Sequence, residues 1–187
     1  MKERRLFTAI KIHPDECFLE LFNKLKKSLQ FDKIKWVEEG NIHMTLKFIG
    51  ETPEDRIDEI TKALEKASDG IKPFELVLED VGIFGSSYKP RVVWFGIRQE
   101  PELLKLSENM FRELENIGFE RDRQNFVPHL TVGRVKFVKD KKIFRMVIEK
   151  NKPGLIQKIN IDKFYLFESI LRREGPVYEI VETFGLG

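Results

Sequence analysis

Two short motifs in the chain place a histidine and a threonine two residues apart, at 43–46 (His-Met-Thr-Leu) and 129–132 (His-Leu-Thr-Val). In a β-strand successive side chains point to opposite faces, so each His shares a face with its Thr and the apolar residues occupy the other. The two histidines lie 86 residues apart, a little under half of the 187-residue chain. This spacing suggests two halves, each contributing one His and one Thr to a common site.

Chance is a poor explanation for the repeated pattern. The chain holds 3 His and 6 Thr. The chance that two of the three His each precede a Thr by two places is roughly one in 300. One such motif alone is more often a half-buried structural histidine on a strand. Two of them favour a functional site.

Two facing imidazoles form an acid and a base that need no metal, because an unperturbed His titrates at about pH 6.5 and serves either role at neutral pH. One takes a proton from an attacking oxygen, and the other gives a proton to a leaving oxygen. The hydroxyls of Thr45 and Thr131 can donate hydrogen bonds to the non-bridging oxygens of a phosphodiester. The set suits in-line displacement at phosphorus, catalysed by His43 and His129, and we expect no metal and no cofactor.

Metal binding and serine catalysis are the competing interpretations. Zinc normally recruits further His, Cys or carboxylate ligands, and a hydroxyl two residues along a strand is a poor substitute. The remaining soft ligands, His13 and Cys17, lie in an unrelated segment, and we expect His13 to be structural or exposed. A Ser-His-Asp hydrolase of the α/β type needs a G-x-S-x-G turn, which the sequence lacks.

Two cations near the motifs are secondary candidates for binding phosphate. Lys47 shares the face of His43 if the strand alternates regularly, although an exposed lysine on a strand is more often just solvated. Strict alternation places Arg134 on the face opposite His129, unless Gly133 permits a bulge that turns the arginine round. A bidentate guanidinium would suit a phosphate.

The composition indicates a globular protein without a generally basic surface. The 33 basic and 31 acidic residues leave a net charge of +2, so affinity for nucleic acid must come from a local patch. The single Cys17 cannot form an internal disulfide, which fits a reducing compartment, and we expect a cytoplasmic monomer. No secretion signal and no membrane-spanning stretch is visible, so we expect no membrane contact.

Strands and helices are mixed without strict βαβ alternation, which predicts an α+β fold. The residues 82–87, rich in Gly and Ser, read as a loop, and Thr52 reads as the N-cap of a helix that begins at Pro53. The expected strands are 6–12, 34–37, 42–50, 74–78, 92–97, 126–135, 157–161, 164–170 and 177–184, and the expected helices are 14–30, 53–67, 101–117 and 139–150.

Both motifs and their surroundings resemble the two-histidine (2H) phosphoesterase superfamily, and within it the bacterial and archaeal RNA 2′,3′-cyclic phosphodiesterases, long called 2′-5′ RNA ligases. The resemblance covers most of the chain. It is carried by 5–10 (Arg-Leu-Phe-Thr-Ala-Ile), 43–51 (His-Met-Thr-Leu-Lys-Phe-Ile-Gly-Glu), 126–131 (Phe-Val-Pro-His-Leu-Thr), 166–169 (Leu-Phe-Glu-Ser) and 175–178 (Gly-Pro-Val-Tyr).

The resemblance implies one domain over residues 1–187, made of two pseudo-symmetric lobes. Each lobe would hold an antiparallel β-sheet with flanking outer helices, and both motifs would face a central cleft. The activity implied is opening of a terminal 2′,3′-cyclic phosphate, on RNA or a small cyclic nucleotide, to a 2′-phosphate.

The same resemblance assigns roles that the spacing cannot. His43 would protonate the leaving 3′ oxygen, His129 would activate water, and Thr45 and Thr131 would hold the phosphate. With a 5′-hydroxyl in place of water as the attacking group, the same site would join RNA ends through a 2′-5′ bond.

Three interpretations stay open at this point. The first is the cyclic phosphodiesterase, and the second is a non-catalytic module that binds RNA ends or nucleotides in the same cleft. The third is a structural protein whose motif residues belong to the core. The second half departs from the first after Val132, where Gly133-Arg134 replaces the Lys-Phe pair, so the halves need not share the phosphate equally.

Overall fold

Nine strands, four α-helices and two short 3₁₀ turns make up the described part of the chain, in a computed structural model that describes residues 2–86, 88–121, 126–152, 154–173 and 175–187. The elements are β1 Glu3–Lys11, α1 Glu16–Ser28, β2 Lys33–Trp36, η1 Glu39–Asn41, β3 His43–Pro53, η2 Glu54–Arg56, α2 Ile57–Ser68, β4 Phe74–Ser86, β5 Lys89–Ile97, α3 Pro101–Asn116, β6 His129–Phe137, α4 Lys141–Lys150, β7 Leu155–Ile161, β8 Lys163–Leu171 and β9 Pro176–Gly185.

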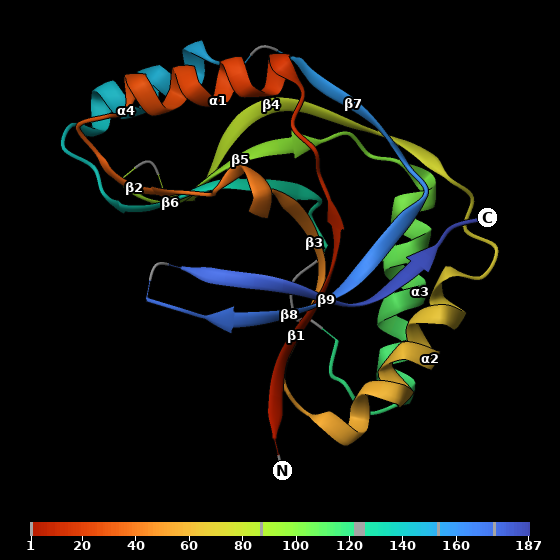
Figure 1. Cartoon of the computed structure of the whole chain (residues 1–187). Coiled ribbons are helices and arrows are strands. Elements are labelled where there is room, and N and C mark those ends of the chain that lie inside the picture. The colour runs from red at the N-terminus through yellow and green to blue at the C-terminus, as the bar shows by residue number, and fades with distance from the viewer. Residues whose placement is uncertain (1, 87, 122–125, 153, 174) are drawn as a thin grey trace.

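The strands form two antiparallel sheets, and the two motifs lie in different ones. The first sheet has the order β3-β1-β8-β9 and contains His43, and the second has the order β2-β6-β5-β4-β7 and contains His129. Helices α2 and α3 pack together beside the first sheet, and α1 and α4 pack on the second (Figure 1). The predicted α+β fold, with two antiparallel sheets and outer helices, is confirmed.

The sheets do not correspond to consecutive stretches of sequence. The first sheet joins β1 and β3, from the beginning of the chain, to β8 and β9, from its end. Helix α1 follows a strand of the first sheet yet packs on the second, and α3 makes the opposite crossing. The two sheets are therefore interlocked, and no single cut in the chain separates them.

The core forms because each helix presents an apolar stripe to a sheet. In α1, Phe18, Phe22 and Leu25 recur at helical spacing and are fully buried, and the ring of Phe18 meets that of Phe95 on β5 at 4.9 Å. Asp15 caps this helix, since its carboxylate accepts a hydrogen bond from the backbone N–H of Phe18 at 2.8 Å.

The prediction of a loop at 82–87 is wrong, because β4 continues to Ser86. Of these six residues, Ser87 alone lies outside the described ranges. The small residues allow close packing within the sheet and do not form a turn. A Cβ on Gly82 would lie 2.1 Å from the Trp94 ring, so glycine is what lets this ring lie across β4. Gly85 has a φ of +99°, next to an irregularity in the pairing of β4 with β5.

The predicted capping of the second helix by Thr52 is also wrong. Thr52 belongs to β3, and its hydroxyl donates a hydrogen bond to the carbonyl of Gly50 at 3.1 Å. The chain passes through the 3₁₀ turn η2 before α2 begins at Ile57. The strand outcompetes the cap because Thr52 pairs with Arg4 of β1.

We predict that Phe18→Ala lowers the free energy of unfolding by about 3–5 kcal/mol, because it opens a cavity between α1 and the second sheet. Urea denaturation measures this change. Lys27→Ala, on the exposed side of the same helix, is the matched control and should change the stability by less than about 0.5 kcal/mol. Equal effects from the two substitutions would contradict the packing described for α1.

Candidate active site

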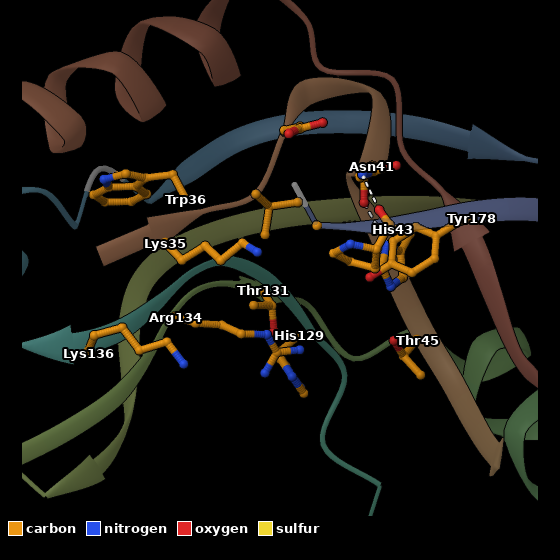
Figure 2. Close-up of a pocket in the computed structure, with 14 residues that line it drawn as sticks. Lys35, Trp36, Asn41, His43, Thr45, His129, Thr131, Arg134, Lys136 and Tyr178 are labelled. Carbon is orange, nitrogen blue, oxygen red and sulfur yellow. Dashed lines mark hydrogen bonds between the residues drawn. The ribbon is translucent and has the colours of Figure 1, made fainter. Parts of the chain in front are cut away.

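A pocket of about 300 Å³ lies between the two sheets and is lined by both His-x-Thr pairs (Figure 2). Strand β3 supplies His43 and Thr45, and strand β6 supplies His129, Thr131 and Arg134. The structure thus brings together the residues that the sequence analysis proposed for catalysis or phosphate binding, except Lys47. The rest of the lining comes from 35–38, Asn41, Lys136, 175–176 and Tyr178.

Each histidine is held by the same local hydrogen bond. Nδ1 of His43 lies 2.7 Å from the carbonyl oxygen of Asn41, and Nδ1 of His129 lies 2.8 Å from that of Val127. A carbonyl oxygen only accepts, so Nδ1 carries the proton in both rings, a tautomer assigned from these contacts. The Nε2 atom of each neutral ring is therefore left as a proton acceptor.

Aromatic rings fix the histidines further. The His43 ring lies 5.2 Å from Phe7 and 5.0 Å from Tyr178, between centroids, and the His129 ring meets Phe84 edge-on at 4.6 Å. Phe7 and Tyr178 belong to a small aromatic cluster on the pocket side of the first sheet. His43 is thus the more enclosed of the two histidines.

A β-bulge lies at the fourth residue of each motif. In the pairing with β1, Thr45 lies opposite Ala9 and Lys47 opposite Thr8, which leaves Leu46 without a partner. In the second sheet, Thr131 lies opposite Trp94 and Gly133 opposite Val93, so Val132 is skipped in the same way. Such a bulge inverts the alternation of faces beyond it.

The bulge in β3 corrects the prediction for Lys47. This lysine does not share the face of His43, because it is 4% exposed and its Nζ donates a hydrogen bond to the carbonyl of Glu120 at 2.8 Å. Its amine also lies 5.7 Å from the centre of the Phe111 ring. Phe48, which regular alternation would place on the core face with Met44 and Leu46, is 47% exposed and stacks on Phe7 at 5.6 Å between ring centroids.

The sequence predicts Arg134 on the face of His129 only if a bulge interrupts the strand, and β6 contains such a bulge. Beyond the bulge Arg134 lies on the face of His129 and Thr131 and lines the pocket (Figure 2). Gly133 takes the opposite face, where a Cβ would lie 2.9 Å from Ile34 and 3.0 Å from Trp36. The glycine therefore lets β2 pack closely against β6.

The surroundings of His43 disfavour its charged form. Burial lowers the pKa of His43 below 6.5, the hydrogen bond to Asn41 opposes this effect, and the positive charge of Arg134 lowers the pKa further. The pKa of Tyr178 is raised, chiefly by burial, while the charges of Arg134 and Arg5 act against that rise. These surroundings therefore favour a neutral imidazole at His43.

Sequence reasoning missed six polar or aromatic side chains that line the pocket, namely Lys35, Trp36, Glu38, Asn41, Lys136 and Tyr178. Tyr178 stood within the segments that carried the family resemblance, so that signal was available. Lys35 is placed by its pairing with Arg134 between β2 and β6, which no local pattern reveals, and Lys136 follows Arg134 by two residues on β6. Asn41 contributes its backbone carbonyl to His43, and its side chain donates to the carbonyl of Pro176 at 3.3 Å.

No group of three or more His, Cys, Asp or Glu side chains within the described ranges is arranged to hold a metal ion. His13 and Cys17 lie outside the pocket. None of the helices in the described ranges is long and apolar enough to cross a membrane.

Comparison with known proteins places the chain in a family. The sequence model of the LigT-like phosphoesterases matches twice, at residues 10–94 and 96–178. The RNA 2′,3′-cyclic phosphodiesterase of Methanocaldococcus jannaschii is 35% identical over 178 residues, covering 95% of this chain and 98% of that protein. The protein of the same name from Archaeoglobus fulgidus is 34% identical over 181 residues, covering 96% and 99%.

Solved structures agree with this placement. The protein TT0787 of Thermus thermophilus is similar with a TM-score of 0.79 and 27% identity, covering 97% of both chains. E. coli LigT complexed with 3′-AMP shares the fold with a TM-score of 0.73 at 22% identity, covering 99% of both chains. Both halves of the sequence and nearly its whole length are therefore accounted for, and the chain belongs to the LigT-like phosphoesterase family.

Proposed function

We propose that the protein hydrolyses the 2′,3′-cyclic phosphate at an RNA end, or on a nucleoside, to a 2′-phosphate by metal-independent catalysis. The observation that carries the proposal is the matched pair of histidines, which line one pocket with the same tautomer and a threonine each. The relatives named RNA 2′,3′-cyclic phosphodiesterase support the choice of substrate. We propose further that the two lobes act as one domain, in a cytoplasmic monomer.

The proposed reaction exchanges one P–O bond for another. Nε2 of His129 takes a proton from water as the water oxygen bonds to phosphorus. The bond from phosphorus to the 3′ oxygen breaks, and Nε2–H of His43 protonates that oxygen. The acid and base roles follow the family resemblance, and the product keeps its phosphate on the 2′ oxygen.

Thr45, Thr131 and Arg134 hold the phosphate in this proposal. The two hydroxyls donate to the non-bridging oxygens from opposite sheets, and the guanidinium adds a charge-assisted hydrogen bond. Because the phosphate is negative, its binding offsets the charge of Arg134 and raises the pKa of His43 towards the protonated form that the reaction needs. A 5′-hydroxyl in place of water as the attacking group would form a bond from phosphorus to the 5′ oxygen as the bond to the 3′ oxygen breaks, and the product would be a 2′-5′ phosphodiester.

We predict that His43→Ala and His129→Ala each lower the rate of hydrolysis of a nucleoside 2′,3′-cyclic phosphate by about 10²- to 10⁴-fold. Chromatography in the presence of EDTA should show the 2′-phosphate as the only product of the wild type. His13→Ala is the control, since this histidine lies outside the pocket. A folded wild type that binds the cyclic nucleotide without turnover would favour the binding module, and abolition by EDTA would contradict the mechanism.

We predict that His43 titrates below pH 6.5 in the free protein, because burial and Arg134 disfavour its protonation. NMR titration of the imidazole measures this pKa. A saturating nucleoside 2′-phosphate should raise it, since the anion favours the charged ring, and Arg134→Met should raise it in the free protein. The rate of hydrolysis should show a bell-shaped pH profile whose two apparent pKa values belong to the pair of histidines.

We predict that Arg134→Met lowers kcat/KM by about 10- to 100-fold, because a charge-assisted hydrogen bond to the phosphate is lost. Arg134→Lys should recover part of this loss, since it keeps the charge without the bidentate geometry. Arg91→Met, an exposed arginine on β5 next to the residue that pairs with Arg134, is the control. Unchanged kcat/KM in Arg134→Met would remove this arginine from phosphate binding.

A further inference from the structure

The pocket carries more positive charge than a cyclic mononucleotide can neutralise. A 2′,3′-cyclic phosphodiester has a single negative charge, yet Lys35, Arg134 and Lys136 all line the pocket (Figure 2). One carboxylate, that of Glu38, also lines it and offsets one of these cations. Once Arg134 is paired with the cyclic phosphate, a lysine charge is left for another anion.

The cations continue beyond the pocket along one face of the ribbon formed by β2 and β6. Lys35 pairs with Arg134 and Lys33 pairs with Phe137, and residues that pair across an antiparallel ladder share a face. The pairing skips Lys136, and a bulge of this kind lets Lys136 and Phe137 lie on the same side of β6. Ile34, between these lysines on β2, packs against the core, which leaves both lysines on the other face of the strand, where Lys35 lines the pocket. We call Lys33, Lys35, Arg134, Lys136 and Phe137 the basic strip.

The outer end of the basic strip presents aromatic rings to solvent. Phe137 is 56% exposed, and nearby Phe31 is 71% exposed with the amine of Lys139 placed 5.1 Å from its ring centre. The backbone N–H of Lys139 donates to the carboxylate of Asp32, which ties the two segments together. Exposed rings interleaved with cations are the combination that binds single-stranded nucleic acid without sequence preference.

We propose that the basic strip binds the RNA strand that leads to the cyclic end, an inference that rests on the proposed hydrolysis of cyclic phosphates. Each nucleotide on the 5′ side adds one phosphodiester charge, and the strip supplies further lysines in order away from the histidines. Lys35 and Lys136 contact the first upstream phosphate. Lys33 contacts the next phosphate, and a base stacks on Phe137.

The test compares a nucleoside 2′,3′-cyclic phosphate with an RNA tetranucleotide that ends in the same cyclic phosphate. The variant Lys33→Gln/Phe137→Ser changes only exposed residues outside the pocket. It should lower kcat/KM for the tetranucleotide about tenfold and leave the nucleoside unchanged. Lys62→Gln/Leu104→Ser, exposed positions on α2 and α3, is the matched control and should change neither rate.

Two results overturn the basic strip while leaving the proposed function intact: equal kcat/KM of the wild type for both substrates, or full activity of the double variant on the tetranucleotide. If the wild type hydrolyses neither substrate, that result refutes the proposed function instead. Fluorescence anisotropy with a labelled tetranucleotide ending in a 2′-phosphate then decides on the strip. Affinity about tenfold weaker in the double variant supports it, and equal affinity overturns it.

Discussion

The pocket depends on a β-bulge at the fourth residue of each His-x-Thr-x motif. Without it, the residue five places after each histidine would point into the core, and the residue before that would point into the pocket. The bulges at Leu46 and Val132 reverse this order in both strands. The burial pattern along the first six residues is consequently the same in β3 and β6, although their sequences differ after the motif.

The same backbone device produces two different environments. Beyond the bulge, β3 turns Phe48 towards the pocket side and β6 turns Arg134 there. Phe48 extends the aromatic cluster that encloses His43, and Arg134 adds a positive charge that acts on the same ring. Both disfavour the protonated form of His43, so an anion bound beside this ring would favour its protonation.

Much of the fold and the main site residues could be predicted from the sequence, because they rest on local patterns. The apolar stripe of α1 and the two His-x-Thr pairs are readable from period and spacing alone. The small residues at 82–86 were wrongly interpreted as a loop. Gly82 allows the close approach of Trp94, and Gly85 lies beside an irregularity in the pairing of β4 with β5. Lys47 was misplaced because regular alternation was assumed across Leu46. Arg134 was kept as a candidate because a bulge permitted by Gly133 was allowed for, and the bulge lies at the preceding residue, Val132. Lys35 was missed because its place depends on pairing between distant strands.

The interlocking of the two sheets also determines when the pocket can form. Strand β3, with His43, lies at the edge of its sheet and pairs only with β1, whose other neighbour is β8. The ion pair of Arg4 with Glu168 joins these two strands across 164 residues of sequence. Pairings this distant in sequence form late and slowly. While the protein is being made on the ribosome, β1 therefore keeps an open edge until β8 has been synthesised, and the pocket stays incomplete until β9 has supplied Pro176 and Tyr178.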